Sequence, residues 1–389
     1  MNITNLYEAL RIGTDKALLA ADRCVYRATG GKLGKLMFSE QVKTTNVGSK
    51  VKILAQDEDS VTIAKVDANG NYLNDGFRIL SSTDFHFGDD TALRFKCMDM
   101  FMKHIKATTP DLVVLTGDVI QSKFQHFDAI QFAQFMEKIG VYWAFVFGNH
   151  EAREEKGRFK HLLMSCKNSF PHCIALEGRK DLFGYGNYCI NIMKNENELL
   201  RTLFMFDSGR DVIEEYVKSH GAPADISSYD FIKDNQKNWY KEKVTALREK
   251  YGDVKSFMYM HIPINEYEEV ISPEKQEDGV YPFTDKCQVI YGKAYETVGC
   301  SKFNSGLFAL IKELDSTDAV FSGHDHVNDF CVIYQGVYLV YNQNNGYETY
   351  TLSEKCECEE KDWVQGVTIT DIAPDGAFDI SRRFNRMYL

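Results

Sequence analysis

The sequence of 389 residues lacks any apolar run long enough to span a bilayer. Residues 1–8 also lack the basic start and apolar core of a secretory signal peptide. These two absences predict a cytoplasmic protein with no membrane partner. In that compartment the ten cysteines are expected to be reduced thiols rather than a disulfide framework.

Positive charge is scarce, because 45 Lys and Arg face 56 Asp and Glu, which gives a formal net charge of −11. General nucleic-acid binding requires a basic surface, so this class of function is disfavoured. A nucleotide substrate is still allowed, because a bound metal can supply positive charge locally. The sequence also lacks internal repeats and low-complexity tracts, and its length allows one large domain or two.

Residues 1–76 differ from the rest of the chain and are expected to form a small N-terminal accessory segment. The leucine spacing over residues 5–20 predicts an amphipathic helix, and residues 51–54 and 61–66 are typical of strands. This segment holds more Lys and Arg than Asp and Glu, unlike the whole chain. It could serve regulation or an interaction, or it could simply pack against the main domain, which is the simpler expectation.

Residues 77–389 are expected to form the main domain, because a new pattern of elements begins at Phe77. Apolar strands at 77–80, 111–115 and 141–147 alternate with two amphipathic helices, the second of which is expected to start at Asp128 as its N-cap. Later strands are expected at 188–192, 202–206, 256–260, 318–321, 331–341 and 367–380, with helices at 234–250 and 307–314. The pattern predicts an α/β fold of mixed α+β character, in which two sheets pack as a β-sandwich with helices outside.

Polar clusters with metal-ligand chemistry follow these apolar runs. They are Asp84-Phe85-His86, Gly117-Asp118, Gly148-Asn149-His150-Glu151, His261 and Gly323-His324-Asp325-His326. Side chains beyond the carboxyl ends of strands can converge on one edge of a sheet. Carboxylate, imidazole and amide ligands without thiolate suit Zn, Mn or Fe. The sequence therefore predicts a centre of two metal ions, with Asp118 as the best candidate for the bridging carboxylate.

Each cluster alone has an ordinary explanation. Asp84 could cap a helix, Asp118 could belong to a strand-end turn, and His261 could be a histidine at the boundary of the core. Their shared order and their common position after strands favour the metal site over these alternatives. Gly117, Gly148 and Gly323 are expected to permit tight backbone turns beside it.

The ordered set of clusters resembles the calcineurin-like metallophosphoesterase superfamily and, within it, the purple-acid-phosphatase-related branch. Residues 261–267, 304–308 and 323–329 also resemble segments of that branch, and the likeness covers about residues 77–341. The resemblance implies the four-layer fold of the metallo-dependent phosphatases. It also implies one metal held by Asp84, His86, Asp118 and His326, and a second held by Asp118, Asn149, His261 and His324. His150 would lie near the phosphoryl group without binding a metal.

One position departs from the pattern of the branch. Purple acid phosphatases have a tyrosine three residues after the bridging aspartate, where it ligates ferric iron. This chain has Gln121 there, and His86 appears in the first motif instead. The tyrosinate-to-iron colour is therefore expected to be absent, and the metals are left as Fe, Mn or Zn.

Residues 268–302 form a long connection between two ligand clusters and are expected to be a lid or a binding loop. Aromatic residues in it could stack on a base or a leaving group, although a structural role is equally open; they are Tyr281, Phe283, Tyr291 and Tyr295. Glu296 resembles a position of the family. The candidate substrate contacts are therefore Tyr295, Glu296, Asn149 and His150.

These residues predict an enzyme, a phosphatase or phosphodiesterase, that uses a hydroxide held between two metals to attack a phosphate ester. His150, steadied by Glu151, is expected to stabilise the phosphoryl oxygens and to protonate the leaving oxygen. Arg153 and Arg158 are weak candidates for the cationic clamp that a monoester prefers. The expected partner is a small phosphoester or nucleotide substrate. The alternative is a catalytically weak metal-binding scaffold or interaction protein on the same fold.

Overall fold

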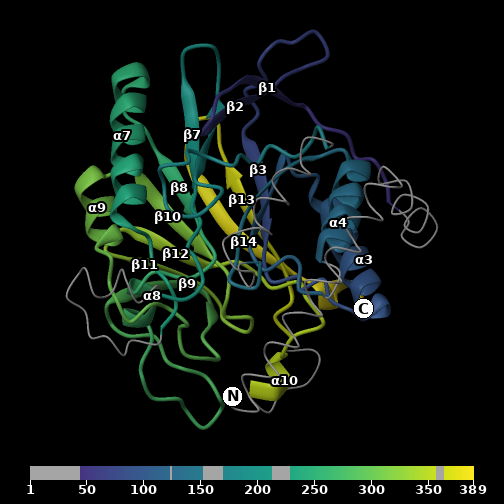
Figure 1. The fold of residues 1–389 in the computed structure, drawn as a ribbon, viewed down its shortest axis with the longest axis vertical. Coiled ribbons are helices and arrows are strands. Elements are labelled where there is room, and N and C mark those ends of the chain that lie inside the picture. Colours follow the sequence, from purple (N-terminus) through teal and green to yellow (C-terminus); the bar gives the residue numbers. More distant parts are fainter. Residues whose placement is uncertain (1–43, 123–124, 152–169, 213–227, 356–362) are drawn as a thin grey trace, which may run out of the picture.

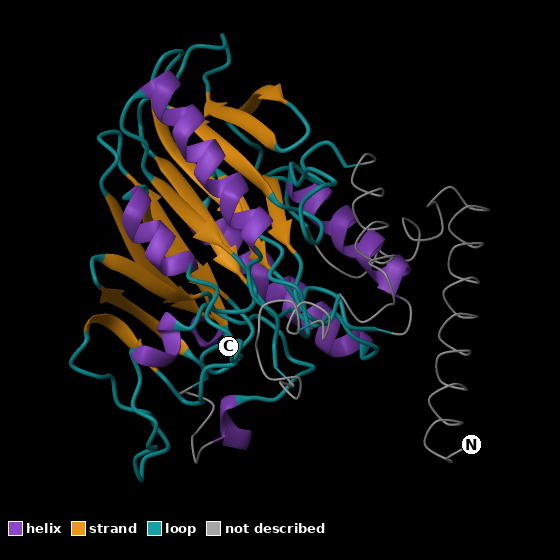
Figure 2. Ribbon diagram, turned by 60° about the vertical axis from the view of Figure 1, so that its left-hand side comes forward, coloured by secondary structure: helices purple, strands orange, loops and turns teal. Residues whose placement is uncertain are grey.

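The computed structural model describes residues 44–122, 125–151, 170–212, 228–355 and 363–389 (Figure 1). Two β-sheets pack against each other, and helices cover their outer faces (Figures 1 and 2). The strand order is β1-β2-β6-β7-β8-β10-β12-β11-β9 in the nine-stranded sheet and β14-β13-β3-β4-β5 in the five-stranded sheet. The mixed α/β fold with two sheets is therefore confirmed.

The five-stranded sheet carries the first three predicted strands. They are β3 (Phe77–Ser82), β4 (Leu112–Thr116) and β5 (Tyr142–Val146), which run parallel, while β13 (Gly366–Ile372) and β14 (Phe378–Phe384) continue the sheet antiparallel. Helices α3 (Thr91–Thr108) and α4 (Gln125–Ile139) are the expected crossover helices. The prediction of Asp128 as the N-cap of the second helix is wrong. Asp128 lies in the first turn of α4, where a carboxylate favours the helix dipole, and it accepts a hydrogen bond from Arg94 at 2.6 Å.

The nine-stranded sheet collects the remaining strands. They are β1 (Val51–Gln56), β2 (Ser60–Lys65), β6 (Tyr188–Met193), β7 (Leu199–Met205), β8 (Ser256–Tyr259), β9 (Cys287–Lys293), β10 (Thr317–Ser322), β11 (Asp329–Tyr334) and β12 (Val337–Tyr341). Helices α7 (Asp234–Tyr251) and α9 (Leu307–Leu314) lie over its outer face, as Figure 2 shows. Three short helices complete the described elements: α8 (Glu266–Glu269), α10 (Leu352–Lys355) and η4 (Asn385–Tyr388).

Alternation along the central strands divides the apolar side chains between two cores. In β8, Phe257 and Tyr259 belong to the core between the sheets, whereas Met258 packs in the core beneath α7 and α9. In β10, Phe321 faces the inner core and Val320 the outer one. Successive side chains of a strand point to opposite faces, so a strand covered on both sides is apolar throughout. This explains the continuous apolar runs in the sequence.

The two strands expected within residues 1–76 are present as β1 and β2. They extend the large sheet, because β2 pairs in parallel with β6 over five residues from Ser60 to Ala64. Packing against the main domain is therefore what the described part of this segment does. The helix expected at residues 5–20 lies outside the described residues, and the boundary at residue 76 stays a prediction.

Residues 268–302 are less of a loop than the sequence suggests. They contain β9, which forms one edge of the large sheet by pairing with β11. The aromatic residues expected to stack on a substrate mostly pack internally: Phe283 meets Phe330 edge to face at 5.2 Å, and the hydroxyl of Tyr291 is buried. The structural alternative thus holds for these two residues, because both side chains pack against the hydrophobic core.

Two further observations bear on the early expectations. Among the described residues, no helix combines the length and apolar character needed to cross a bilayer. The described cysteines are free thiols; they are Cys97, Cys173, Cys189, Cys287, Cys300 and Cys331.

Candidate metal centre

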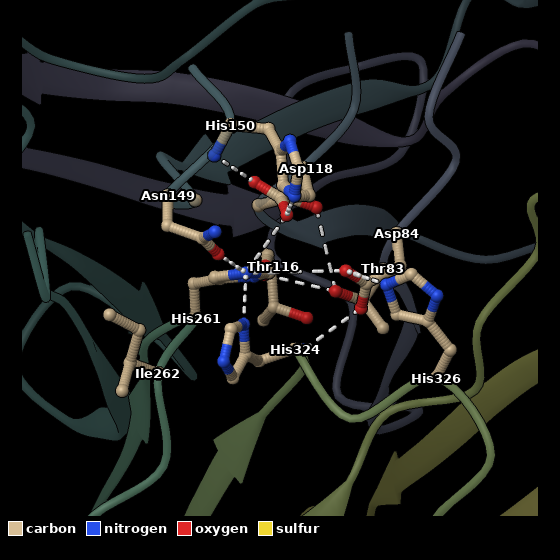
Figure 3. A network of polar contacts seen from close by, with 12 residues as sticks. Thr83, Asp84, Thr116, Asp118, Asn149, His150, His261, Ile262, His324 and His326 are labelled. Carbon is tan, nitrogen blue, oxygen red and sulfur yellow. Dashed lines mark hydrogen bonds and ion pairs between the residues drawn. The ribbon is translucent and has the colours of Figure 1, made fainter. Parts of the chain in front are cut away.

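The candidate ligands lie directly after the carboxyl ends of five strands, where the two sheets meet. In chain order, β3 leads to Asp84 and His86, β4 to Asp118, β5 to Asn149 and His150, β8 to His261, and β10 to His324 and His326. Strands β3, β4 and β5 are parallel, and so are β8 and β10. Parallel strands end at the same edge of a sheet. Figure 3 shows the side chains that it labels among these residues pointing toward one another; they are Asp84, Asp118, Asn149, His150, His261, His324 and His326.

One group of potential ligand atoms surrounds Oδ1 of Asp84. Nε2 of His86 and Nε2 of His326 each lie 3.4 Å from this oxygen and 3.1 Å from each other. Oδ2 of Asp118 lies 3.6 Å from Nε2 of His86. All four side chains are buried. The structure therefore brings together the residues of the first predicted metal set.

A second group surrounds Asp118 and His261. Nε2 of His261 lies 3.3 Å from Oδ2 of Asp118 and 2.9 Å from Oδ1 of Asn149. Nδ1 of His324 lies 3.3 Å from the same nitrogen of His261. These are the residues of the second predicted set. Asp118 is within reach of both groups, as a bridging carboxylate must be.

Hydrogen bonds fix the ring nitrogens of two histidines. Nδ1 of His261 lies 2.8 Å from the carbonyl oxygen of Thr116, and Nδ1 of His86 bonds Oε1 of Gln121. Because both partners are acceptors, each Nδ1 carries the proton, and a neutral ring then presents a lone pair at Nε2. In the neutral form of the ring, Nε2 of His261 faces the amide oxygen of Asn149 as acceptor against acceptor, a conflict that either a proton or a cation removes. A cation between them would satisfy both, as in metal sites whose histidines are held from behind.

Asp84 supplies the second test of the metal fit. Its Oδ2 accepts a hydrogen bond from the backbone of His324 at 2.9 Å, but its buried Oδ1 has no hydrogen-bond partner. Leaving a buried acceptor unsatisfied costs roughly 1–3 kcal/mol, more when it is charged. That oxygen is the one that the two histidine nitrogens surround. The residues present therefore fit a metal pair, and the donor set suits Zn, Mn or Fe.

The carboxylates and imidazoles shift each other's pKa. Burial alone would lower the pKa of His261, but the charges of Asp118 and Asp84 outweigh it and raise this pKa to about 10. Burial would raise the pKa of Asp84, yet the charges of His326 and His261 hold it well below its usual range. Burial, together with the charge of His261, lowers the pKa of His324 to about 3. The carboxylates therefore attract positive charge to the centre, which two cations would supply.

Backbone strain is concentrated at this site. Four candidate ligands have positive φ angles: 51° at Asp84, 43° at His86, 50° at Asp118 and 79° at His324. Residues other than glycine rarely adopt this region, and each instance costs of order 1–3 kcal/mol. Such strain persists only where the surrounding structure fixes the chain, and it often marks functional sites.

The three glycines beside the ligands act for different reasons. Gly117 has φ of 90°, so the predicted tight turn is present there. A Cβ added at Gly148 would lie 2.1 Å from Oδ1 of Asp118, and one at Gly323 would lie 2.0 Å from Oγ1 of Thr83. At these two positions glycine is needed for close approach of the chain to its neighbours rather than for a left-handed turn.

Glu151 has a structural role that the sequence did not indicate. Its buried carboxylate accepts hydrogen bonds from the backbone amides of Asp118 at 3.0 Å, Ile120 at 3.1 Å and Gly148 at 2.7 Å. The expectation that Glu151 also steadies His150 stays a prediction. Glu151 ties the turn after β4 to the turn after β5, and in this way it positions the proposed bridging residue.

His150 lies beside the centre on the same turn. Its backbone amide donates to Oδ1 of Asp118 at 2.8 Å, and its Nε2 lies 3.7 Å from Oδ2. Its ring meets that of His86 edge to face at 4.9 Å, and its side chain is 19% exposed, whereas the carboxylate and histidine ligand candidates are buried. His150 is therefore within reach of solvent and of a substrate.

Tyr295 and Glu296 brace the loop that carries His326. Their backbone amides both donate to Oδ1 of Asn328, at 2.9 and 3.1 Å. The carboxylate of Glu296 accepts from the amide of Val327 at 3.2 Å and pairs with Lys355 at 3.3 Å. These contacts give both residues a structural role, and substrate contact by either stays a prediction.

Two aromatic neighbours were not found from the sequence. Tyr350 stacks on the ring of His326 at 4.4 Å, and Tyr229 meets that of His324 edge to face at 4.3 Å. Both tyrosines come from segments between elements, with no motif around them. Gln121 was noted only as a departure, but its bond to His86 shows what it does.

A family model described as calcineurin-like phosphoesterase matches residues 77–328. That match covers more than half of the chain and contains every candidate ligand. The chain belongs to the calcineurin-like phosphoesterase family. Its relatives include a protein of Arabidopsis thaliana named probable inactive purple acid phosphatase 14, which is 26% identical over 310 residues, 70% of this chain and 71% of that protein. The expected likeness to the purple-acid-phosphatase branch is confirmed.

Two other comparisons agree with this family. Phosphatase DCR2 of Saccharomyces cerevisiae is 26% identical over 283 residues, which cover 66% of this chain but only 45% of that protein. The crystal structure of a dimetal phosphatase from Danio rerio superposes with a TM-score of 0.50 at 12% identity, covering 80% of this chain and 97% of that one. At such low identity the superposition shows a shared fold.

Proposed function

We propose that the protein hydrolyses phosphate esters with two metal ions bound between the ends of the two sheets. The observation that carries this proposal is the convergence of metal-ligand atoms on a buried carboxylate oxygen that has no hydrogen-bond partner. Nε2 of His86, Nε2 of His326 and Oδ1 of Asp84 lie within 3.4 Å of one another in a buried cluster. A cation bound there would satisfy the buried carboxylate oxygen and would take the lone pairs of the neutral rings as ligands. The substrate class is a small phosphoester or a nucleotide.

Residues of the chain would have separate roles in binding the metals, donating a proton and positioning the ligands. Asp118 would join the two halves of the centre, since it approaches His86 on one side and His261 on the other. His150 would hydrogen-bond the phosphoryl group and donate a proton from its ring to the leaving oxygen. When bound, the two cations would supply Lewis-acid stabilisation and a water of lowered pKa. Glu151 would keep the turns of Asp118 and His150 in register through its backbone contacts.

The alternative is a metal-binding scaffold with little or no hydrolysis. The name of the Arabidopsis relative, which includes the words "probable inactive", supports keeping it. The intact ligand geometry favours activity, because a scaffold does not need acceptor nitrogens held in strained backbone around one point. Direct assay must decide between the two.

The choice between monoester and diester rests on a cationic clamp. Among the described contacts of the candidate metal ligands, none involves Lys or Arg. Arg153 and Arg158, the candidates for this role, lie outside the described residues. Both ester classes therefore belong in the assay.

The deciding experiment combines metal analysis with hydrolysis of two model substrates. Purified protein is loaded with Mn, Fe or Zn, its metal content is measured, and turnover of mono- and bis-(4-nitrophenyl) phosphate is compared. We expect about two metals per chain and hydrolysis of at least one ester, and His326→Ala should lose one metal together with nearly all hydrolysis. Two bound metals without hydrolysis of a wider phosphoester panel would favour the scaffold. Protein that binds no metal would refute both readings.

A further inference from the structure

A cavity of about 270 Å³ lies between an edge strand of the large sheet and an edge strand of the small sheet. Gly292 and Lys293 of β9 line one side, and Arg382 and Phe384 of β14 line the other. Each of these strands is the last of its sheet. None of the lining residues is a candidate metal ligand, although Tyr295, one of the candidate substrate contacts, also lines the cavity. We call it the Arg382 pocket.

The lining of the Arg382 pocket is cationic in a protein that is acidic overall. Lys293, Arg382 and Arg386 face a single carboxylate, that of Asp329. Asp329 pairs with Arg382. Among the described residues, Lys293 has no ion-pair partner, and Arg386 donates only to the carbonyl oxygen of Trp363 at 2.8 Å. Within the described part of the chain, neither Lys293 nor Arg386 forms an ion pair, and Arg386 lies in the field of Asp329.

The two guanidinium groups of the pocket are held in place. Arg382 lies 5.0 Å and Arg386 4.0 Å from the ring centre of Phe384, and Arg382 also lies 4.8 Å from that of Tyr291. Stacking on aromatic rings reduces the freedom that an arginine loses when it binds an anion. The described contacts of Arg382 use only Nη1, so its Nε and Nη2 keep their donors.

The size of the pocket limits what it can take. Pockets for drug-sized ligands measure roughly 300–1,000 Å³, so this one suits a smaller group. Arg and Lys donors in a fixed array match the oxygens of a tetrahedral dianion, which accepts several charge-assisted hydrogen bonds at once. We propose that the Arg382 pocket binds a small molecule through its phosphate group, at a site distinct from the metal centre.

The test is calorimetric titration of the metal-loaded protein with inorganic phosphate and with sulfate. The test variant is Lys293→Gln combined with Arg386→Gln, which removes two of the three cations and keeps the Arg382–Asp329 pair. The matched control is Lys52→Gln combined with Lys106→Gln, two exposed lysines away from the pocket. The control separates loss of a binding site from general loss of positive charge.

We expect the wild type and the control to bind one more phosphate per chain than the test variant does. If the test variant still binds this phosphate, its affinity should be at least tenfold weaker. Any phosphate bound at the metal centre contributes equally to all three proteins, so the difference isolates the pocket. This holds whether or not the protein is an active hydrolase. Identical titrations of test variant and control would overturn the proposal. Equal binding of acetate would overturn the assignment to tetrahedral dianions.

Discussion

The ring of Tyr350 lies flat on the ring of His326, with centroids 4.4 Å apart and an angle of 9° between the planes. The hydroxyl of Tyr350 also accepts from the backbone amide of His326 at 3.3 Å and donates to Glu296 at 2.8 Å. One tyrosine thus fixes both the ring and the backbone of a candidate metal ligand. Partners behind a ligand orient it, and removing them typically weakens metal binding about 10–100-fold.

Replacing Tyr350 should therefore weaken metal binding at the site of Asp84, His86 and His326. Tyr350→Ala removes the stack and both hydrogen bonds, and we expect about 10–100-fold weaker binding of one metal. Tyr350→Phe keeps the stack and should cost only a few-fold. Competition with a chromogenic chelator measures both. If the alanine variant competes like the wild type, the stack has no such role.

Gln121 gives a second prediction about the same metal. Gln121→Leu removes the acceptor that holds the proton on Nδ1 of His86, so the ring can turn or change tautomer, and affinity should fall by about tenfold or more. Gln121→Glu keeps an acceptor and serves as the control. The same competition assay applies. Equal affinity in the leucine and glutamate variants would show that the hydrogen bond does not orient His86.

His150 and His326 should separate catalysis from metal binding. We expect His150→Ala to keep two metals and to lose roughly 10²–10⁴-fold in kcat, which is the usual contribution of a general acid. His326→Ala should lose a metal as well as turnover. Metal content by elemental analysis and kcat on a nitrophenyl ester are the two readouts. Full activity of His150→Ala would remove it from the mechanism.

Much of the fold and of the centre follows from local patterns in the sequence. The helix expected at 307–314 is α9 itself, because its apolar positions recur at helical spacing and Asp315, with φ of 45°, ends it. The candidate ligands could be found because each lies just after an apolar strand. Residues 1–43 and 152–169, which include Arg153 and Arg158, lie outside the described part.

The misses share a physical cause. The capping role given to Asp128 failed because a local signal does not fix where a helix begins, and α4 begins one turn earlier. The lid expected at 268–302 proved to contain a sheet edge, since strand pairing with β11 is a long-range contact that composition does not reveal. Tyr350 lies 24 residues from His326 along the chain, and only the fold brings them together.

The last prediction concerns His104, a buried histidine of α3 that lies away from the metal centre. Its Nε2 bonds Oδ1 of Asn385 at 2.8 Å, and its Nδ1 is buried without a partner. Burial lowers the pKa of His104 to about 4. The unfolded chain, with a histidine pKa near 6.5, therefore takes up a proton at a higher pH than the folded protein does.

The unfolded state binds more protons between about pH 6.5 and pH 4, so His104 makes the folded state less stable as the pH falls through this window. At pH 5 the loss should reach roughly 2 kcal/mol relative to pH 8. His104→Gln, which keeps a donor for Asn385 but does not titrate, should remove that part of the pH dependence. Urea unfolding of both proteins at pH 8 and pH 5 measures it. All other groups titrate alike in the wild type and in His104→Gln. If the unfolding free energy changes by the same amount between pH 8 and pH 5 in both proteins, His104 is protonated equally in the folded and unfolded states.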